Sequence, residues 1–147
     1  MAVLAGDHII VKLDDNGGTA RTFDDGDIIS VNMPLTFKQH MVAGFGDATE
    51  NYINGQLQSP VTLKGYLTTT ALVGTHTVLK DAFENGAQVS LAVQVGNNAT
   101  PTSGDPEFTG EYIIESYKPT LETGSAIQFE ATLKPAIGTA PSWGTVS

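Results

Sequence analysis

The sequence predicts a mainly β fold: a β-sandwich or partly closed barrel of antiparallel strands, with one flanking helix at about 75–85 and a long inter-strand loop at about 42–59. Two stretches, 87–95 and 125–134, alternate between apolar and polar residues, as strands do when one face of a sheet is buried. A single segment has helical spacing, because Val78 and Ala82 form an apolar i,i+4 pair beside polar neighbours. Together these patterns predict one small β domain with a helix packed against its sheet.

The first forty residues contain short candidate strands separated by turns. The turns at 14–18 and 24–27 are built from Asp, Asn and Gly, and the Asn-Gly pair in the first favours a hairpin. Pro34 has no N–H to donate to a ladder, so it interrupts the third strand. The expected strands are His8–Leu13, Arg21–Phe23, Ile28–Met33 and Leu35–His40.

The connection from Val42 to Ser59 has no clear periodicity, and a connection that long inside a compact domain usually serves a function. It carries the apolar residues Phe45, Tyr52, Ile53 and Leu57. These side chains either fold back over the core of their own domain or pack onto a neighbouring subunit, since apolar groups clustered on a loop mark interfaces.

The next strand, 61–68, has Gly65 in its middle, where a glycine usually marks a bulge or a close backbone approach. A long strand is expected at 107–118, ended by Pro119, with Phe108, Tyr112 and Ile114 on one face. Its other face carries Thr109, Glu111, Ile113, Glu115 and Tyr117.

Composition excludes several function classes. The net charge of −9 argues against wrapping nucleic acid, where Lys and Arg displace phosphate counterions. The chain has no Cys, and no apolar run approaches the roughly 20 residues of a membrane span. The N-terminal segment lacks the features of a signal peptide, which favours a protein made and used in a cytoplasm or in a particle assembled there.

No motif supports catalysis or metal binding. The acidic turns lack the alternating ligand spacing of a calcium loop, and His8, His40 and His76 form no short ligand pair. There is no nucleophile elbow and no glycine-rich phosphate loop. The sequence therefore predicts neither an enzyme nor a bound cofactor.

Two ordered blocks carry a family resemblance. The first reads Phe45-Gly46-Asp47, Tyr52-Ile53, Asn54-Gly55 and Val61-Thr62-Leu63-Lys64-Gly65, and the second runs from Phe108 to Tyr117 and from Ile127 to Leu133. In this order they resemble the bacteriophage major tail (tail tube) protein family of the non-contractile, siphophage type, in which Asn54-Gly55 would correspond to a turn. The resemblance covers most of residues 40–135 and implies a single tail-tube domain over 1–147, with a tail at 135–147 that is mobile in part.

The resemblance implies a structural virion protein. Its subunits would form hexameric rings that stack into a tube, assembled in the host cytoplasm, with tape measure, tail terminator and tail tip proteins as partners. The implied subunit-interface residues are Phe45, Asp47, Tyr52, Ile53 and Leu57. The implied channel-lining residues are Thr109, Glu111, Glu115, Gln128, Glu130 and Thr132. Their carboxylates would repel phosphates, so that DNA passes through the channel without binding.

Two alternatives share this composition. A capsid decoration protein would be equally acidic and β-rich, but it would need no channel. A small carbohydrate-binding β-sandwich would expose several aromatic residues on one face, whereas this chain has one Trp, Trp143, near its end.

Overall fold

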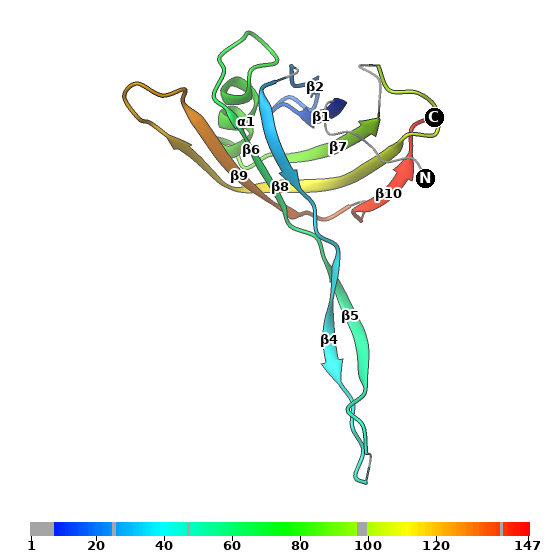
Figure 1. Ribbon diagram of the computed structural model, residues 1–147. Helices are drawn as coiled ribbons and strands as arrows, with labels where there is room; N and C mark the ends of the chain where they lie inside the picture. Colours follow the sequence, from blue (N-terminus) through cyan, green and yellow to red (C-terminus); the bar gives the residue numbers. More distant parts are fainter. Residues whose placement is uncertain (1–7, 25, 47, 97–99, 139) are drawn as a thin grey trace.

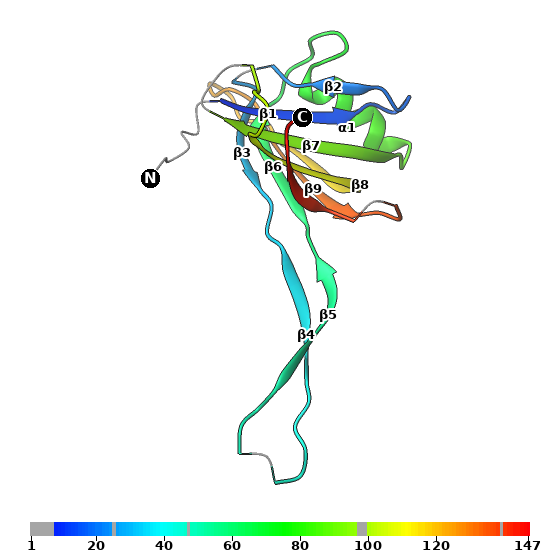
Figure 2. The same ribbon diagram turned by 90° about the vertical axis from the view of Figure 1, so that its right-hand side faces the viewer.

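The computed structural model describes residues 8–24, 26–46, 48–96, 100–138 and 140–147. They form a body, built on one large antiparallel sheet, and a two-stranded arm that projects from it (Figures 1 and 2). The sheet order is β2-β1-β7-β8-β9-β6-β3, and β10 also pairs with β8. The strands of the body are β1 (His8–Asp14), β2 (Ala20–Thr22), β3 (Ile28–Asn32), β6 (Val61–Tyr66), β7 (Gln88–Gly96), β8 (Pro106–Thr120), β9 (Gln128–Pro135) and β10 (Ser142–Thr145).

The core lies between one face of this sheet and the helix α1 (Thr75–Glu84). The sheet curves beneath α1, which lies at the end of the body opposite the arm (Figure 1). The helix buries Val78, Leu79 and Ala82 against alternate residues of the strands. Tyr112 is fully buried at the centre of β8, and its hydroxyl lies 3.1 Å from the Ser59 hydroxyl. The mainly β fold with one helix at about 75–85 is confirmed.

Gly65 explains how the edge strand β3 joins the sheet. A Cβ at this position would lie 2.1 Å from the Asp27 carbonyl oxygen, so only a glycine permits the approach. The pairing of β3 with β6 shifts register between Ile28 and Ser30, opposite this glycine, and the Tyr66 N–H donates to the Asp27 carbonyl over 2.8 Å. The bulge and the close approach expected at Gly65 are therefore both present.

A second irregularity reverses part of the face assignment of β8. The pairing of β8 with β9 shifts between Ile114 and Ser116, so Glu115 is an extra residue and the alternation changes phase after it. Tyr117 consequently lies on the core side, where its ring contacts those of His76 and Phe129, and its hydroxyl lies 2.9 Å from Nδ1 of His76. Burial raises the pKa of Tyr117 to about 12. The prediction that Tyr117 shares the face of Glu111 is wrong, because a bulge exchanges the two faces of a strand.

The long loop expected at 42–59 is in large part a strand. β5 (Tyr52–Gln58) pairs antiparallel with β4 (Thr36–Met41), and together they form the arm, defined as residues 36–58. Asn54 and Gly55 lie inside β5 and not in a turn. They border a register shift at which Gly55 lets the imidazole of His40 lie close to the backbone. The sequence hid this strand because both faces of the arm are exposed, which removes the alternation that marks a half-buried strand.

Candidate assembly surfaces

The arm exposes apolar side chains that the body does not cover. Its cross-strand pairs place Phe37 beside Leu57 and Met41 beside Tyr52, all on one face, with Gln39 and Asn54 hydrogen-bonded between them. Phe37, Met41 and Tyr52 are about half exposed or more. We call this set, Phe37, Met41, Tyr52 and Leu57, the apolar arm face. Sequence reasoning missed Phe37 and Met41 because each stands alone among polar residues in β4.

The tip of the arm, residues 42–51, carries the most exposed apolar residue of the described chain. Phe45 has a relative exposure of 112%, so its ring touches almost nothing of its own subunit. At the base of the tip, the Val42 N–H donates to the Asn51 carbonyl over 2.7 Å, and the Tyr52 hydroxyl donates to Glu50 over 2.9 Å. Asp47, predicted as an interface residue, lies outside the described residues.

The remaining predicted interface residues do not form one surface. Tyr52 and Leu57 share the apolar arm face, whereas Ile53 pairs with His40 on the opposite face and is 54% exposed. Leu57 is half-buried at the base of the arm. None of these four, Phe45 included, folds back over the core, which is complete without them.

The sheet of the body has a polar face opposite the core. In β9 the buried residues are Phe129, Ala131 and Leu133, so Gln128, Glu130 and Thr132 point the other way. In β8, Thr109 and Glu111 alternate in the same sense with the buried Phe108, Gly110 and Tyr112. Glu115 reaches the same face through an ion pair of 3.6 Å with Lys134. The structure thus brings all six predicted channel-lining residues onto one face.

This polar face is not uniformly acidic. Register pairs place Glu130 between Lys64 of β6 and Lys118 of β8. Lys12 is on the same side, since it lies opposite Ala92, which is in turn opposite Thr109. Four of the seven basic residues of the chain, Lys12, Lys64, Lys118 and Lys134, therefore lie among its carboxylates. Sequence reasoning missed this mixture because it depends on which strands are neighbours.

Glu111 is held more firmly than the other carboxylates of the polar face. Its Oε1 accepts a hydrogen bond from the Ser90 hydroxyl, and its Oε2 lies 3.5 Å from Nε2 of Gln88. The same Gln88 nitrogen donates to the Ile137 carbonyl over 2.6 Å, which ties the segment after β9 to β7. These contacts make Glu111 partly structural, so its substitution would disturb more than the charge of the face.

The first acidic turn, at Asp15, shapes the backbone. Asp15 accepts hydrogen bonds from the N–H groups of Gly17 and Thr19 and from Nε of Arg21. The Thr19 N–H, followed by Arg21, lowers the pKa of Asp15 below its ordinary value. Within the described residues no group of three or more His, Asp or Glu side chains could hold a metal ion. The same part of the chain contains no helix with the length and apolarity needed to cross a membrane.

Solved structures of tails and tubes share this fold. One chain from the tail of an empty gene transfer agent particle with C6 symmetry superposes with a TM-score of 0.72 at 15% identity, covering 97% of this chain and 99% of that one. The SPP1 tail tube gives a TM-score of 0.71 at 13% identity, covering 95% of this chain and 78% of that one. A chain of the PVC sheath–tube complex, an extracellular contractile injection system, gives 0.71 at 14% identity with 98% and 93% coverage.

No protein-family model and no curated protein sequence matches the chain. The fold of the chain is the one found in these tails and tubes. The fold expected from the resemblance to tail tube proteins is confirmed.

Proposed function

We propose that this chain is the major tail (tube) subunit of a phage or phage-like particle of the non-contractile type. Its copies form hexameric rings that stack around a channel, and the channel conducts DNA during ejection. The role is structural and not catalytic, and the site of action is the virion tail, assembled in the host cytoplasm. The C6 symmetry of the gene transfer agent tail supports six copies per ring.

The observation that carries this proposal is the arm. A domain with a complete core has no need of a projecting hairpin with an apolar face, and a two-stranded hairpin alone is at best marginally stable in water. Exposed apolar surface of this kind marks a protein interface. The arm residues Phe45, Tyr52, Ile53 and Leu57, with Asp47 from the sequence, would pack onto a neighbouring copy.

The polar face is the surface that we assign to the channel. Thr109, Glu111, Glu115, Gln128, Glu130 and Thr132 would line it. The interspersed lysines would keep the wall close to neutral, so that passing phosphates meet neither a strongly repelling nor a binding surface. At physiological salt a charge acts over about 8 Å, so the residues of this face decide how DNA moves. Tape measure, terminator and tip proteins would occupy the channel and the ends of the tube.

Electron microscopy of the concentrated, purified protein tests the proposal. Stacked rings or tubes with a central channel are expected. Discrete small oligomers would favour a capsid decoration protein. Monomers at every concentration would favour a binding module such as a carbohydrate-binding domain. Either result contradicts the proposal that the chain forms a tube.

The channel assignment has its own test. Glu130→Lys places three lysines side by side across β6, β9 and β8, so DNA delivery by assembled particles should fall. The matched control is Glu122→Lys, which makes the same charge change on an exposed turn outside the strands. Equal delivery by the two variants would remove the polar face from the channel.

A further inference from the structure

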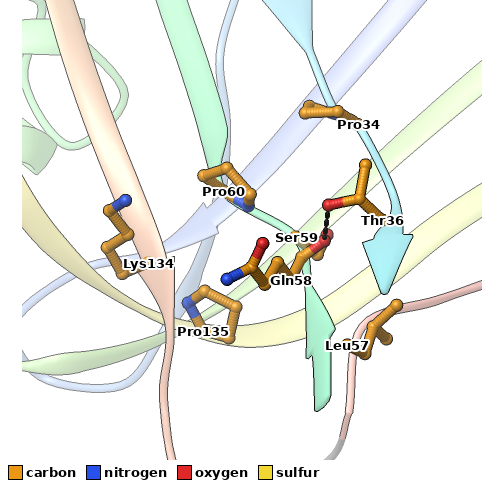
Figure 3. A pocket seen from close by; sticks show the side chains of 8 residues that line it. All are labelled: Pro34, Thr36, Leu57, Gln58, Ser59, Pro60, Lys134 and Pro135. Atoms are coloured by element: carbon orange, nitrogen blue, oxygen red, sulfur yellow. Dashed lines mark hydrogen bonds between the residues drawn. The ribbon is translucent and has the colours of Figure 1, made fainter. Parts of the chain in front are cut away.

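A cavity of about 430 Å³ lies where the arm leaves the body (Figure 3). On its lining, the Thr36 hydroxyl donates to the Gln58 carbonyl over 3.4 Å and so links the two strands of the arm (Figure 3). Lys134 is the one charged residue among the described residues that line it. We call this cavity the root pocket; its lining residues are Pro34, Thr36, Leu57, Gln58, Ser59, Pro60, Lys134 and Pro135.

The root pocket suits an aromatic side chain. The rings of its prolines and the side chain of Leu57 give it apolar walls, and proline brings no N–H that would need a partner. An apolar cavity of roughly 150 Å³ is enough to hold a benzene ring. The root pocket therefore has room for a phenyl ring and for part of the backbone that carries it.

The arm tip has the complementary chemistry. Phe45 presents a phenyl ring that is fully exposed in its own subunit, so little is given up when it binds elsewhere. Residues 42–51 contain two acids, Asp47 and Glu50, and no base. The tip thus combines an aromatic ring with acidic residues, and the root pocket combines apolar walls with Lys134, which also forms the 3.6 Å ion pair with Glu115.

The tip cannot reach the root pocket of its own chain. Thr36 begins β4 at the base of the arm and Phe45 lies four residues beyond the end of that strand, so the extended strand alone separates them by about 17 Å. The occupant must come from a second copy, and a contact between two different surfaces of identical chains is heterologous, which generates rings or open stacks.

We propose that the arm tip of each copy docks in the root pocket of the next, with Phe45 as the inserted side chain. The inference rests on the proposed function, whose arm contact it places on a defined surface of the neighbour. Walls of the pocket come from the arm (Thr36, Leu57) and from the body (Lys134, Pro135), so an inserted ring touches both and restrains the recipient's own arm. Docking of one copy therefore fixes the position of the recipient's arm, whose tip then binds the following copy.

Disulfide trapping tests this contact, because the natural chain has no cysteine. An Ala43→Cys/Thr36→Cys variant, which keeps Phe45 and places a cysteine two residues before it, is assembled and then mildly oxidised; it should give a ladder of covalent oligomers extending beyond the dimer, since each copy links to two others. The matched control is Ala43→Cys/Lys80→Cys, whose second cysteine lies on α1 at the far end of the body (Figure 1). The control should give dimers at most.

The outcomes separate the two proposals. If the double variant does not assemble alone, it is co-assembled with an excess of the natural chain, and linked pairs that form with Thr36→Cys but not with Lys80→Cys support the docking. Tubes that form without links at Thr36, or with equal links in the control, overturn the docking and leave the tube intact. Absence of tubes from the natural chain itself overturns both.

Discussion

The body buries its apolar residues, whereas the arm leaves its apolar residues exposed. In the body, alternate residues of the strands and one stripe of α1 close a core in which Leu63, Leu91 and Leu133 have no more than 1% exposure. In the arm, every residue of β4 is exposed, although Phe37 and Met41 are as apolar as the core. Two strands offer no opposite layer to cover them. The comparison teaches that the body is stable by its own contacts, whereas the apolar arm residues gain contacts only from a partner.

The largest effect is expected for a core truncation in the body. Leu63→Ala removes a fully buried side chain between α1 and the sheet, and it should lower the free energy of unfolding by about 2–5 kcal/mol. Urea denaturation of the monomer, followed by circular dichroism, measures this value. A loss of less than about 1 kcal/mol would mean that the core is looser than its burial indicates.

The edge of the body should be nearly as sensitive at one point. Gly65→Val puts a side chain where the Asp27 carbonyl lies, so β3 must move and stability should fall by about 1–3 kcal/mol. Gly144→Ala in β10 is the control, because its Cβ would meet nothing nearer than 4.0 Å. Equal losses in the same denaturation assay would refute the close approach at Gly65.

Truncation in the arm should separate stability from assembly. Phe45→Ala and Tyr52→Ala remove exposed side chains, so the free energy of unfolding should stay within about 0.5 kcal/mol of the natural value. Tube yield, measured by sedimentation, should nevertheless be lost. A large change in stability would show that the arm belongs to the core, and undiminished tubes would show that it is not an interface.

The smallest effect concerns the turn after β1. The pKa of Asp15 is lowered by hydrogen bonds that exist only in the folded chain, so its carboxylate stabilises the fold above its ordinary pKa of 3.8. That contribution is lost as the pH falls through the lowered folded-state pKa. Asp15→Asn should reduce stability slightly near neutral pH and flatten the stability profile below pH 4. If Asp15→Asn leaves the fall in stability below pH 4 unchanged, other carboxylates account for that fall.

The same contrast decides what could be predicted from the sequence. Half-buried strands and the helix leave periodic patterns, so α1, β7 and β9 were predictable to within a few residues. The strand β5 left no periodic pattern in the sequence, because both faces of the arm are exposed. The bulge at Glu115 moved Tyr117 to the core side, and such register shifts depend on the partner strand. The pairing of Glu130 with Lys64 and Lys118 follows from sheet order alone, which no local pattern encodes.

Hydrogen exchange of the arm, compared between free subunits and assembled tubes, tests the central claim most directly. The claim predicts that amides of 42–58 exchange rapidly in the free subunit and become protected on assembly, while those of β7, an interior strand of the sheet, are protected in both states. An arm that is equally protected in the free subunit, or equally unprotected in the tube, would contradict the claim that it is completed by a neighbour.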